Sequence, residues 1–192
     1  MELLKIIPRD GGNYLKSSLL VYKNALGARK HYEVFSRREI RHRYDLEGFV
    51  AGVMVVVLDE KEEKILISEE YRLGVARTII GVPCGMIGYG ETAEEAAARE
   101  VKEETGLDVE VLRVTKPEYS NPATTPEKLQ IAYAHATGGE LTESDNPNEE
   151  IRSFWLPISE LSDYIQSNEE KMSIVCRLLF EVIYAKKAEN KV

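Results

Sequence analysis

Residues 85–107 read Gly85-Met-Ile-Gly-Tyr-Gly-Glu91-Thr-Ala-Glu-Glu-Ala-Ala-Ala-Arg99-Glu100-Val101-Lys-Glu103-Glu104-Thr-Gly106-Leu107. In this stretch a glycine is followed after five residues by a glutamate. Seven residues later comes the run Arg-Glu-aliphatic-x-Glu-Glu-x-Gly-aliphatic. The first part is a glycine-rich loop, which can press closely against a ligand because glycine reaches backbone conformations closed to other residues. The second part carries the signals of a helix.

Both ends of this helix are marked in the sequence. Thr92 and Glu95 have the spacing of a capping box, in which each residue satisfies a backbone N–H group of the other. Several alanines follow, and alanine is the best helix former. Gly106 is suited to the left-handed residue that commonly ends a helix. The pattern predicts a helix from about Ala93 to Thr105.

Three acidic side chains share one face of the predicted helix. Glu100 lies three and four residues before Glu103 and Glu104, and these spacings place side chains side by side. Clustered carboxylate oxygens are what hard cations such as Mg²⁺ prefer, and Arg99 is placed to hold one carboxylate. Repulsion within such a cluster costs only a few tenths of a kcal/mol per pair. A solvated acidic face without a ligand is therefore the alternative interpretation.

The complete pattern resembles the signature of the Nudix hydrolases. This resemblance implies an α/β (α+β) fold, in which a mixed β-sheet is sandwiched between helices. It also implies a pyrophosphohydrolase that depends on Mg²⁺, with Mn²⁺ as a possible substitute. It identifies Glu100, Glu103 and Glu104 as metal ligands, and it gives catalytic roles to Arg99, which orients a ligand, and to Glu103.

Features outside this pattern resemble the ADP-ribose pyrophosphatase branch of the family. They are the triplet Glu70-Tyr71-Arg72, the run Val82-Pro83-Cys84-Gly85, and Pro122, which lies 15 residues after Leu107. The resemblance implies that Arg72 and Gly85 bind substrate and that Cys84 offers its backbone carbonyl to the metal. A surface salt bridge is the alternative for Arg72. A glycine replaces the acidic residue usual at position 81, which leaves room for a nucleotide sugar other than ADP-ribose.

The chain also has an N-terminal β extension, residues 1–47, ahead of a Nudix domain at 48–192. Residues 17–23 and 31–37 are expected to be strands, and an isolated hairpin is marginal in water. By resemblance, Tyr32 stacks on the nucleoside base and Arg37 meets a phosphate, whereas a half-buried surface tyrosine is the alternative. The same resemblance implies a homodimer in which the extension completes the partner's site, and a monomer whose hairpin folds back on its own domain is the alternative.

The general base is expected in a late loop. In the resembled branch it lies seven residues before an aliphatic-Pro pair, and counting back from Leu156-Pro157 gives Glu149. The neighbouring Glu150 is the alternative, and either residue could instead be a solvated loop acid. The resemblance to this branch implies hydrolysis of the diphosphate bond of ADP-ribose or a related nucleotide sugar, with a nucleoside monophosphate and a sugar phosphate as products.

The remaining elements follow from hydrophobic periodicity. Strands are expected at residues 48–58, 64–69, 108–118, 128–137 and 151–156, and helices at 158–164 and 169–187. The last helix is expected to face the core with the apolar positions Met172, Val175, Leu178, Leu179, Val182 and Ile183.

Composition narrows the class of partner. The 192 residues carry a net charge of −8 and 43% apolar residues. The acidic balance argues against nucleic acid as a partner, and no apolar run is long enough to span a membrane. A cytoplasmic protein is expected, and the family resemblance implies that it acts on a small nucleoside diphosphate derivative. A nucleoside triphosphate or coenzyme A pyrophosphatase, and a non-catalytic nucleotide-sugar sensor, are the rival hypotheses.

Overall fold

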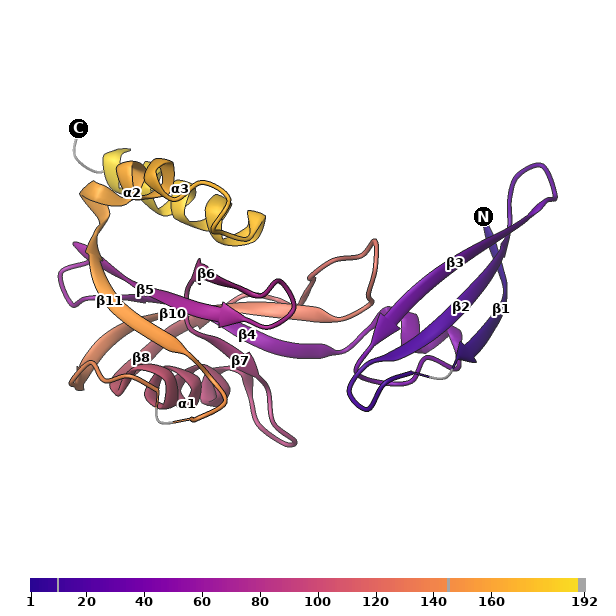
Figure 1. The fold of residues 1–192 in the computed structure, drawn as a ribbon, viewed down its shortest axis with the longest axis horizontal. Helices are drawn as coiled ribbons and strands as arrows, with labels where there is room; N and C mark the ends of the chain where they lie inside the picture. Colours follow the sequence, from indigo (N-terminus) through magenta and orange to yellow (C-terminus); the bar gives the residue numbers. More distant parts are fainter. Residues whose placement is uncertain (10, 145, 190–192) are drawn as a thin grey trace. The chain divides into compact units, whose positions relative to one another are not determined.

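The computed structural model describes residues 1–9, 11–144 and 146–189 (Figure 1). The chain divides into two compact units, and each is described by itself. The first unit comprises Met1–Ala51 and Lys116–Gln130, and the second comprises Gly52–Thr115 and Ile131–Val192. The N-terminal extension is therefore grouped with the later segment Lys116–Gln130.

The first unit holds a three-stranded antiparallel sheet in the order β1-β2-β3, a 3₁₀ helix η1 and a short strand β9. The bounds are β1 Glu2–Arg9, β2 Lys16–Lys23, β3 Arg29–Ser36, η1 Arg43–Glu47 and β9 Glu118–Tyr119. The two expected strands are confirmed as β2 and β3. The sequence did not predict β1, so the hairpin is not isolated: β1 pairs with β2 from Glu2 to Arg9.

One face of this small sheet has a core of its own. Leu20, Val34 and Ile40 are buried together, and Leu46 from η1 packs against them. The register places Leu19 opposite Ile7 and Glu33. Because side chains alternate along a strand, Leu19 and Ile7 belong to the face opposite this core.

The second unit is built on a large sheet with the strand order β11-β5-β4-β10-β8, to which β6 and β7 add at β5 and β4. The strand bounds are β4 Val50–Leu58, β5 Lys64–Arg72, β6 Arg77–Gly81, β7 Cys84–Met86, β8 Leu107–Val114, β10 Lys128–Gly139 and β11 Ile151–Pro157. The helix bounds are α1 Ala93–Thr105, η2 Ile158–Glu160, α2 Leu161–Ser167 and α3 Ile174–Glu189. This mixed sheet with helices confirms the expected fold class.

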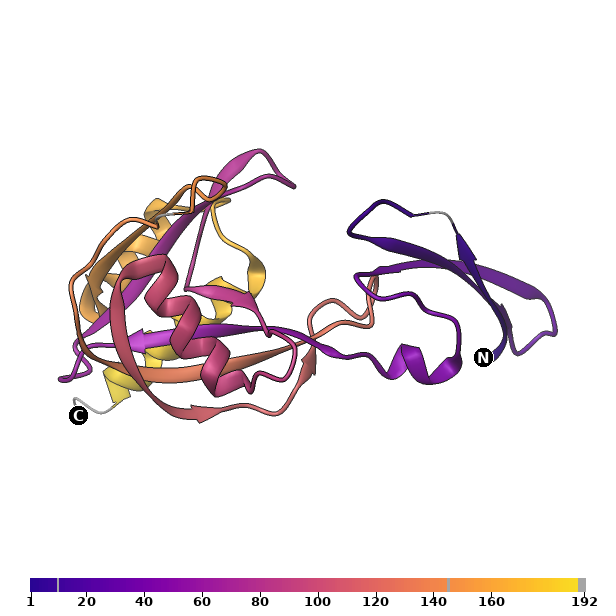
Figure 2. The same ribbon diagram turned by 90° about the horizontal axis from the view of Figure 1, so that it is seen from below.

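Helices cover both faces of the large sheet. Figures 1 and 2 show α1 on one face and α2 with α3 on the other. On the α1 side, Val55 and Val57 from β4 pack with Ala97 and Val101 from α1. On the other side, buried Ile67 packs with Phe180 from α3. Successive side chains of β4 and β5 thus belong alternately to two separate cores. Both faces of these strands are buried, which explains why the sequence shows continuous apolar runs there.

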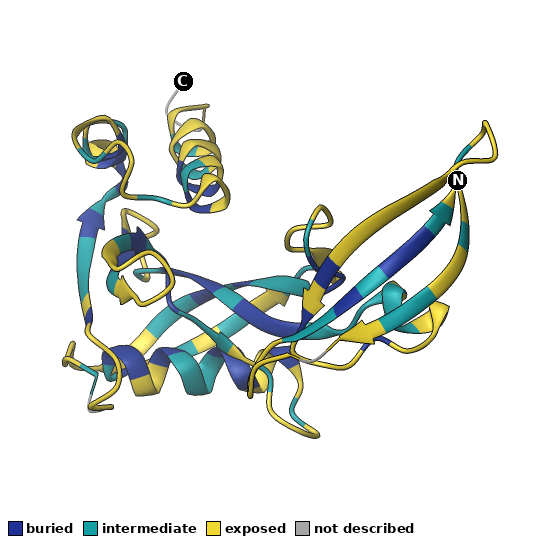
Figure 3. Cartoon of the chain, turned by 45° about the vertical axis from the view of Figure 1, so that its right-hand side comes forward, coloured by how far each residue is buried: buried dark blue, intermediate teal, exposed yellow. Residues whose placement is uncertain are grey.

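The expectation for the last helix was wrong in two respects. The helix begins at Ile174 rather than near 169, because Glu170 has a positive φ of 68° that interrupts helical backbone. Of the expected core positions, Val175, Leu178 and Val182 are exposed. Leu179 is buried as expected, together with Cys176 and Phe180, and the expected Met172 and Ile183 are partly buried against the same core. Figure 3 shows exposed residues along the outer side of α3.

The sequence also missed the short strands β6, β7 and β9, which contain five, three and two residues. Strands of this length carry too few residues for a period of two to be recognised. No helix within the described residues is long and apolar enough to cross a bilayer.

Candidate active site

The helix α1 begins and ends as its sequence predicts. The Thr92 hydroxyl accepts a hydrogen bond from the backbone N–H of Glu95 at 3.1 Å, and the Glu95 carboxylate accepts one from the backbone N–H of Thr92 at 2.8 Å. Gly106 closes the helix in the left-handed conformation, with φ 77°. These local caps fix the rotation and length of the helix, and so they fix where its acidic face lies.

Arg99 is the centre of a charged network on that face. Its guanidinium donates to both oxygens of Glu91 at 2.8 and 2.9 Å, to Glu100 at 2.8 Å and to Glu103 at 3.0 Å. It also donates to the backbone carbonyl of Met86 at 2.9 Å. A guanidinium offers five donors in a rigid fork, and here this fork joins the glycine-rich loop to two carboxylates of the helix.

Glu91 completes the link between loop and helix. Its carboxylate also accepts a hydrogen bond from the backbone N–H of Gly88 at 2.7 Å. The hydrogen bonds from Arg99, followed by that from Gly88, lower the pKa of Glu91 to about 2. Glu91 is therefore ionised at neutral pH and holds the loop in place.

Gly85 is required by close approach. A Cβ atom built at this position would lie 1.8 Å from the Glu100 side-chain carboxyl carbon. Any larger residue would push the Glu100 carboxylate out of its place, or would move β7 away from α1. The first glycine of the pattern is thus explained by the position of one predicted metal ligand, independently of any contact with substrate.

Glu104 is the most deeply buried of the three helix carboxylates, with 6% of its surface exposed. Burial is the main reason that its pKa rises to about 8, and the charges of Glu100 and Glu70 add to the effect. A backbone hydrogen bond from Cys84 acts in the opposite direction. No ion pair to Glu104 occurs among the described residues. The protein therefore holds a buried carboxylate whose negative charge is poorly compensated.

Arg72 lies beside the same carboxylates. Its Nη2 atom is 2.6 Å from a Glu70 oxygen and 3.0 Å from the Cys84 sulfur. Burial raises the pKa of Glu70 despite this ion pair. Burial also raises the pKa of the Cys84 thiol to about 11, so this cysteine stays protonated at neutral pH. Its expected contribution is through the backbone carbonyl and does not need a thiolate.

Glu149 lies in the loop before β11 and is exposed. Its charge is near enough to Glu70, Glu100 and Glu104 to raise the pKa of each. The backbone carbonyl of the neighbouring Glu150 accepts a hydrogen bond from the Tyr71 N–H at 3.0 Å. The loop is thus tied to β5, and it brings Glu149 toward the carboxylate cluster.

The two residues expected in the nucleoside pocket lie in the first unit and have partners there. The Tyr32 hydroxyl donates to the backbone carbonyl of Ala123. Arg37 pairs with Glu127 at 2.5 Å. Glu127 is buried, so Arg37 compensates a buried charge whatever else it binds.

The donor set suits a hard divalent cation. Glu70, Glu100, Glu104 and Glu149 bring carboxylate oxygens to one region, and the pKa values of the first three are raised by burial and mutual repulsion. A bound cation would relieve both effects. In this conformation no three His, Cys, Asp or Glu side chains of the described residues converge on one point. Arg99 donates hydrogen bonds to oxygens of Glu100 and Glu103. These two carboxylates would have to turn away from Arg99 to bind the same cation.

Sequence reasoning missed two members of this cluster. Glu91 was part of the quoted pattern, and its fixed spacing from Arg99 was the available signal. Glu70 stood in the quoted triplet with Arg72, but a triplet does not show that both side chains turn toward α1. Their contacts come from the tertiary structure.

Comparisons with known proteins identify the family of this chain. The NUDIX domain family matches residues 48–177. An ADP-ribose pyrophosphatase of Methanocaldococcus jannaschii is 32% identical over 130 residues, which cover 66% of this chain and 74% of that protein. An ADP-ribose pyrophosphatase of Saccharomyces cerevisiae is 25% identical over 150 residues, which cover 75% of this chain and 64% of that protein.

The fold of a solved structure is also similar. The crystal structure of an ADP compounds hydrolase matches with a TM-score of 0.71 at 19% identity, covering 98% of this chain and 94% of that one. At this identity the likeness shows the fold alone. The chain spans 61–64% of the length of three curated relatives, from Caenorhabditis elegans, Schizosaccharomyces pombe and Saccharomyces cerevisiae.

Proposed function

The chain belongs to the Nudix family, where its relatives place it with the ADP-ribose pyrophosphatase branch, and on this premise we propose that it hydrolyses nucleotide sugars. The substrate is ADP-ribose or a related nucleoside diphosphate sugar. Cleavage of the diphosphate bond gives a nucleoside monophosphate and a sugar phosphate. The observation that carries this proposal is the buried Glu104, whose poorly compensated charge suits a divalent cation better than a structural role.

Residues of α1 and β7 would hold the cation. Nudix hydrolases generally use divalent metal ions, and such an ion neutralises the charge of a diphosphate and lowers the pKa of a bound water. Glu100, Glu103 and Glu104 are its proposed ligands, together with the Cys84 carbonyl. We take the ion to be Mg²⁺, with Mn²⁺ as a substitute. Arg99 positions two of these carboxylates through the hydrogen bonds described above.

Other side chains would handle the substrate and the proton. Arg72 uses only part of its guanidinium for Glu70 and Cys84, and a guanidinium can bind phosphate oxygens with two parallel hydrogen bonds. Glu149 is exposed to water and is the proposed general base, which accepts the proton of the attacking water. The reaction then relies mainly on positioning and charge neutralisation.

A homodimer built on the N-terminal sheet is part of this proposal. Strand β1 already pairs with the β2–β3 hairpin, so pairing alone does not call for a second copy. A dimer is proposed because the face of the sheet opposite its core carries apolar side chains. Ile7 and Leu19 belong to that face, as does Phe35, which is 41% exposed. A second copy would cover this apolar face. Tyr32 lies opposite Leu20 on the other face, so the proposal that Tyr32 and Arg37 reach the partner's substrate rests on the family resemblance.

The substrate proposal is tested with purified protein and a panel of ADP-ribose, other nucleotide sugars, dinucleotides, coenzyme A and nucleoside triphosphates. We expect phosphomonoester release from nucleotide sugars in Mg²⁺ and none in excess EDTA. A preference for triphosphates or coenzyme A would reassign the substrate class. The absence of hydrolysis throughout would leave the sensor hypothesis.

The dimer is tested by light scattering at micromolar concentration, where a monomer mass would refute it. Mixing Arg37→Ala subunits with Glu104→Gln subunits then tests the composite site. If the site is shared, one site of each heterodimer carries both defects and the other carries none, so activity partly returns. No recovery, with heterodimers shown to form, would contradict the composite site.

A further inference from the structure

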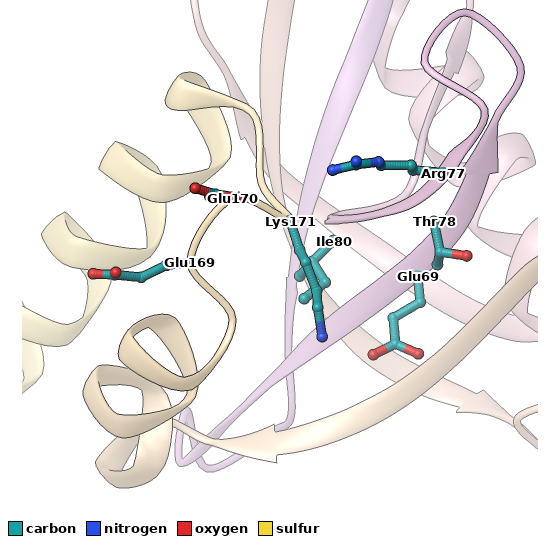
Figure 4. Close-up of a pocket in the computed structure, with 7 residues that line it drawn as sticks. All are labelled: Glu69, Arg77, Thr78, Ile80, Glu169, Glu170 and Lys171. Atoms are coloured by element: carbon teal, nitrogen blue, oxygen red, sulfur yellow. The ribbon is translucent and has the colours of Figure 1, made fainter.

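A polar cavity lies on the side of β5 opposite the carboxylate cluster formed by Glu70, Glu100 and Glu104. It has a volume of about 560 Å³ and is lined by Glu69, Arg77, Thr78, Ile80, Glu169, Glu170 and Lys171 (Figure 4). Glu69 and Glu70 are consecutive residues of a strand, so they point to opposite faces. Glu70 meets Arg72 at the candidate active site, whereas Glu69 meets this cavity. None of the residues assigned to catalysis lines it.

Two cations enter the cavity from different segments. Figure 4 shows Arg77 from β6 extending toward the loop before α3, and Lys171 from that loop extending alongside Ile80. The Lys171 ammonium donates to the Asn168 side-chain oxygen at 3.1 Å. Neither cation is paired with a carboxylate among the described residues.

The acidic residues of the lining do not neutralise these cations. Figure 4 shows Glu169 pointing away from Arg77 and Lys171. The Glu69 carboxylate accepts a hydrogen bond from the Tyr164 hydroxyl at 3.3 Å and lies 3.9 Å from the Arg152 guanidinium. Glu170 also points away from them in Figure 4, so Glu69 is the lining carboxylate on their side of the cavity, and no ion pair joins it to Arg77 or Lys171.

The backbone holds the two cationic segments together. The Ile80 N–H donates to the Lys171 carbonyl at 2.7 Å, and Ile80 forms a parallel bridge with Met172. Arg77 and Ile80 belong to the same strand, so the segment that carries Lys171 is fixed to the strand that carries Arg77. A ligand would meet a site whose backbone is already in place, which reduces the entropy cost of binding.

We propose that this cavity is a second binding site, and that its ligand is a small phosphomonoester such as a sugar phosphate. A phosphomonoester carries a charge of about −1.5 to −2 at pH 7, which matches the two cations. Arg77 can bind two phosphate oxygens through its fork, and Lys171 adds a point charge. The Glu69 carboxylate at the edge can accept hydrogen bonds from sugar hydroxyls. The phosphate contact is independent of the proposed function, whereas the choice of a sugar phosphate rests on it.

The test is a calorimetric titration of the full chain with ribose 5-phosphate in EDTA, so that binding through a divalent metal is removed. We expect saturable binding that Arg77→Ala and Lys171→Ala each weaken by about tenfold or more. Matched controls are Arg177→Ala and Lys186→Ala on α3, which should bind as the wild type does. Binding that is absent in the wild type, or equal in all variants, would overturn the site.

Further ligands separate the parts of the proposal. Inorganic phosphate should bind through the same two cations but more weakly, and ribose should not bind. If phosphate binds as tightly as ribose 5-phosphate, the phosphate site stands and the sugar contact is wrong. Arg77→Ala should still hydrolyse the substrate in Mg²⁺. Loss of binding in EDTA with hydrolysis retained supports a site separate from catalysis, and failure of hydrolysis in the wild type bears on the proposed function alone.

Discussion

Two glutamates of this protein are buried to the same extent but in opposite circumstances. Glu127 in the first unit is 5% exposed and Glu104 in the second is 6% exposed. Glu127 accepts hydrogen bonds from the Arg37 side chain, the Arg37 backbone N–H and the Ser36 hydroxyl. Glu104 has no ion pair among the described residues, and its pKa rises to about 8.

The difference separates a structural carboxylate from a functional one. A buried charge is tolerated when it is paired and hydrogen-bonded, as at Glu127. A buried carboxylate without an ion pair, as at Glu104 despite its backbone hydrogen bond from Cys84, destabilises the fold, and residues with such shifted pKa values are common at functional sites. We therefore interpret Glu127 as a part of the fold and Glu104 as a ligand that awaits a cation. This difference between Glu127 and Glu104 can be tested by mutation and by pH.

The largest expected effect is that of Glu104→Gln on hydrolysis. The change keeps the shape of the side chain but removes the charge of a ligand, so turnover should fall by several orders of magnitude while the fold is kept. Steady-state kinetics and circular dichroism measure the two quantities. Near-normal activity in a folded Glu104→Gln protein would contradict the interpretation of Glu104 as a metal ligand.

Glu149→Gln should have the next largest effect on catalysis. A general base contributes about 10²- to 10⁴-fold, and its loss should lower kcat far more than it changes KM. Glu150→Gln is the matched control and should retain most of the activity. If the effects of the two variants are exchanged, the base is Glu150.

Arg37→Ala tests the structural half of the contrast. It leaves the buried Glu127 carboxylate without its cation, which costs several kcal/mol for a fully buried pair. Because nearly half of the Arg37 side chain is exposed, we expect about 1–2 kcal/mol, measured by urea denaturation. Arg41→Ala, which breaks the exposed pair with Glu39, should cost much less than Arg37→Ala because solvent screens an exposed pair. Equal losses in the two variants would show that Glu127 does not depend on its partner.

The pH dependence of stability gives the smallest effect. Without metal, folding raises the pKa of Glu104, so between the ordinary glutamate pKa and about 8 the folded state binds more protons than the unfolded state. The unfolding free energy should then fall as pH rises through this window. Relative to Glu104→Gln, the wild type should lose about 1–2 kcal/mol between pH 5 and pH 7. If the unfolding free energies of the wild type and Glu104→Gln changed with pH in the same way, the raised pKa of Glu104 would be contradicted.

The sequence predicted local features of the site well. The helix at Ala93–Thr105 has the expected bounds, because its capping box and terminal glycine lie next to the residues that they control. The shared face of Glu100, Glu103 and Glu104 follows from helical spacing alone. Features of this kind need no knowledge of the tertiary structure.

What the sequence could not predict depends on contacts between distant segments. The apolar residues of α3 lie all around the helix, so periodicity predicted Leu179 as a core residue but did not show that Cys176 and Phe180 would be buried while Val175, Leu178 and Val182 would be exposed. Nothing local indicates that Arg37 meets Glu127, since 90 residues separate them. The contrast between the two buried glutamates is likewise a product of the tertiary structure.

The most direct test of that contrast is Mn²⁺ binding to the metal-free protein, measured by isothermal titration calorimetry at pH 8. We expect the wild type to bind Mn²⁺, Glu104→Gln to weaken binding by at least about tenfold, and the exposed-pair control Glu181→Gln to bind as the wild type does. Binding should also weaken toward pH 6, because protons then compete for Glu104. Unchanged Mn²⁺ affinity in a folded Glu104→Gln protein would contradict the account.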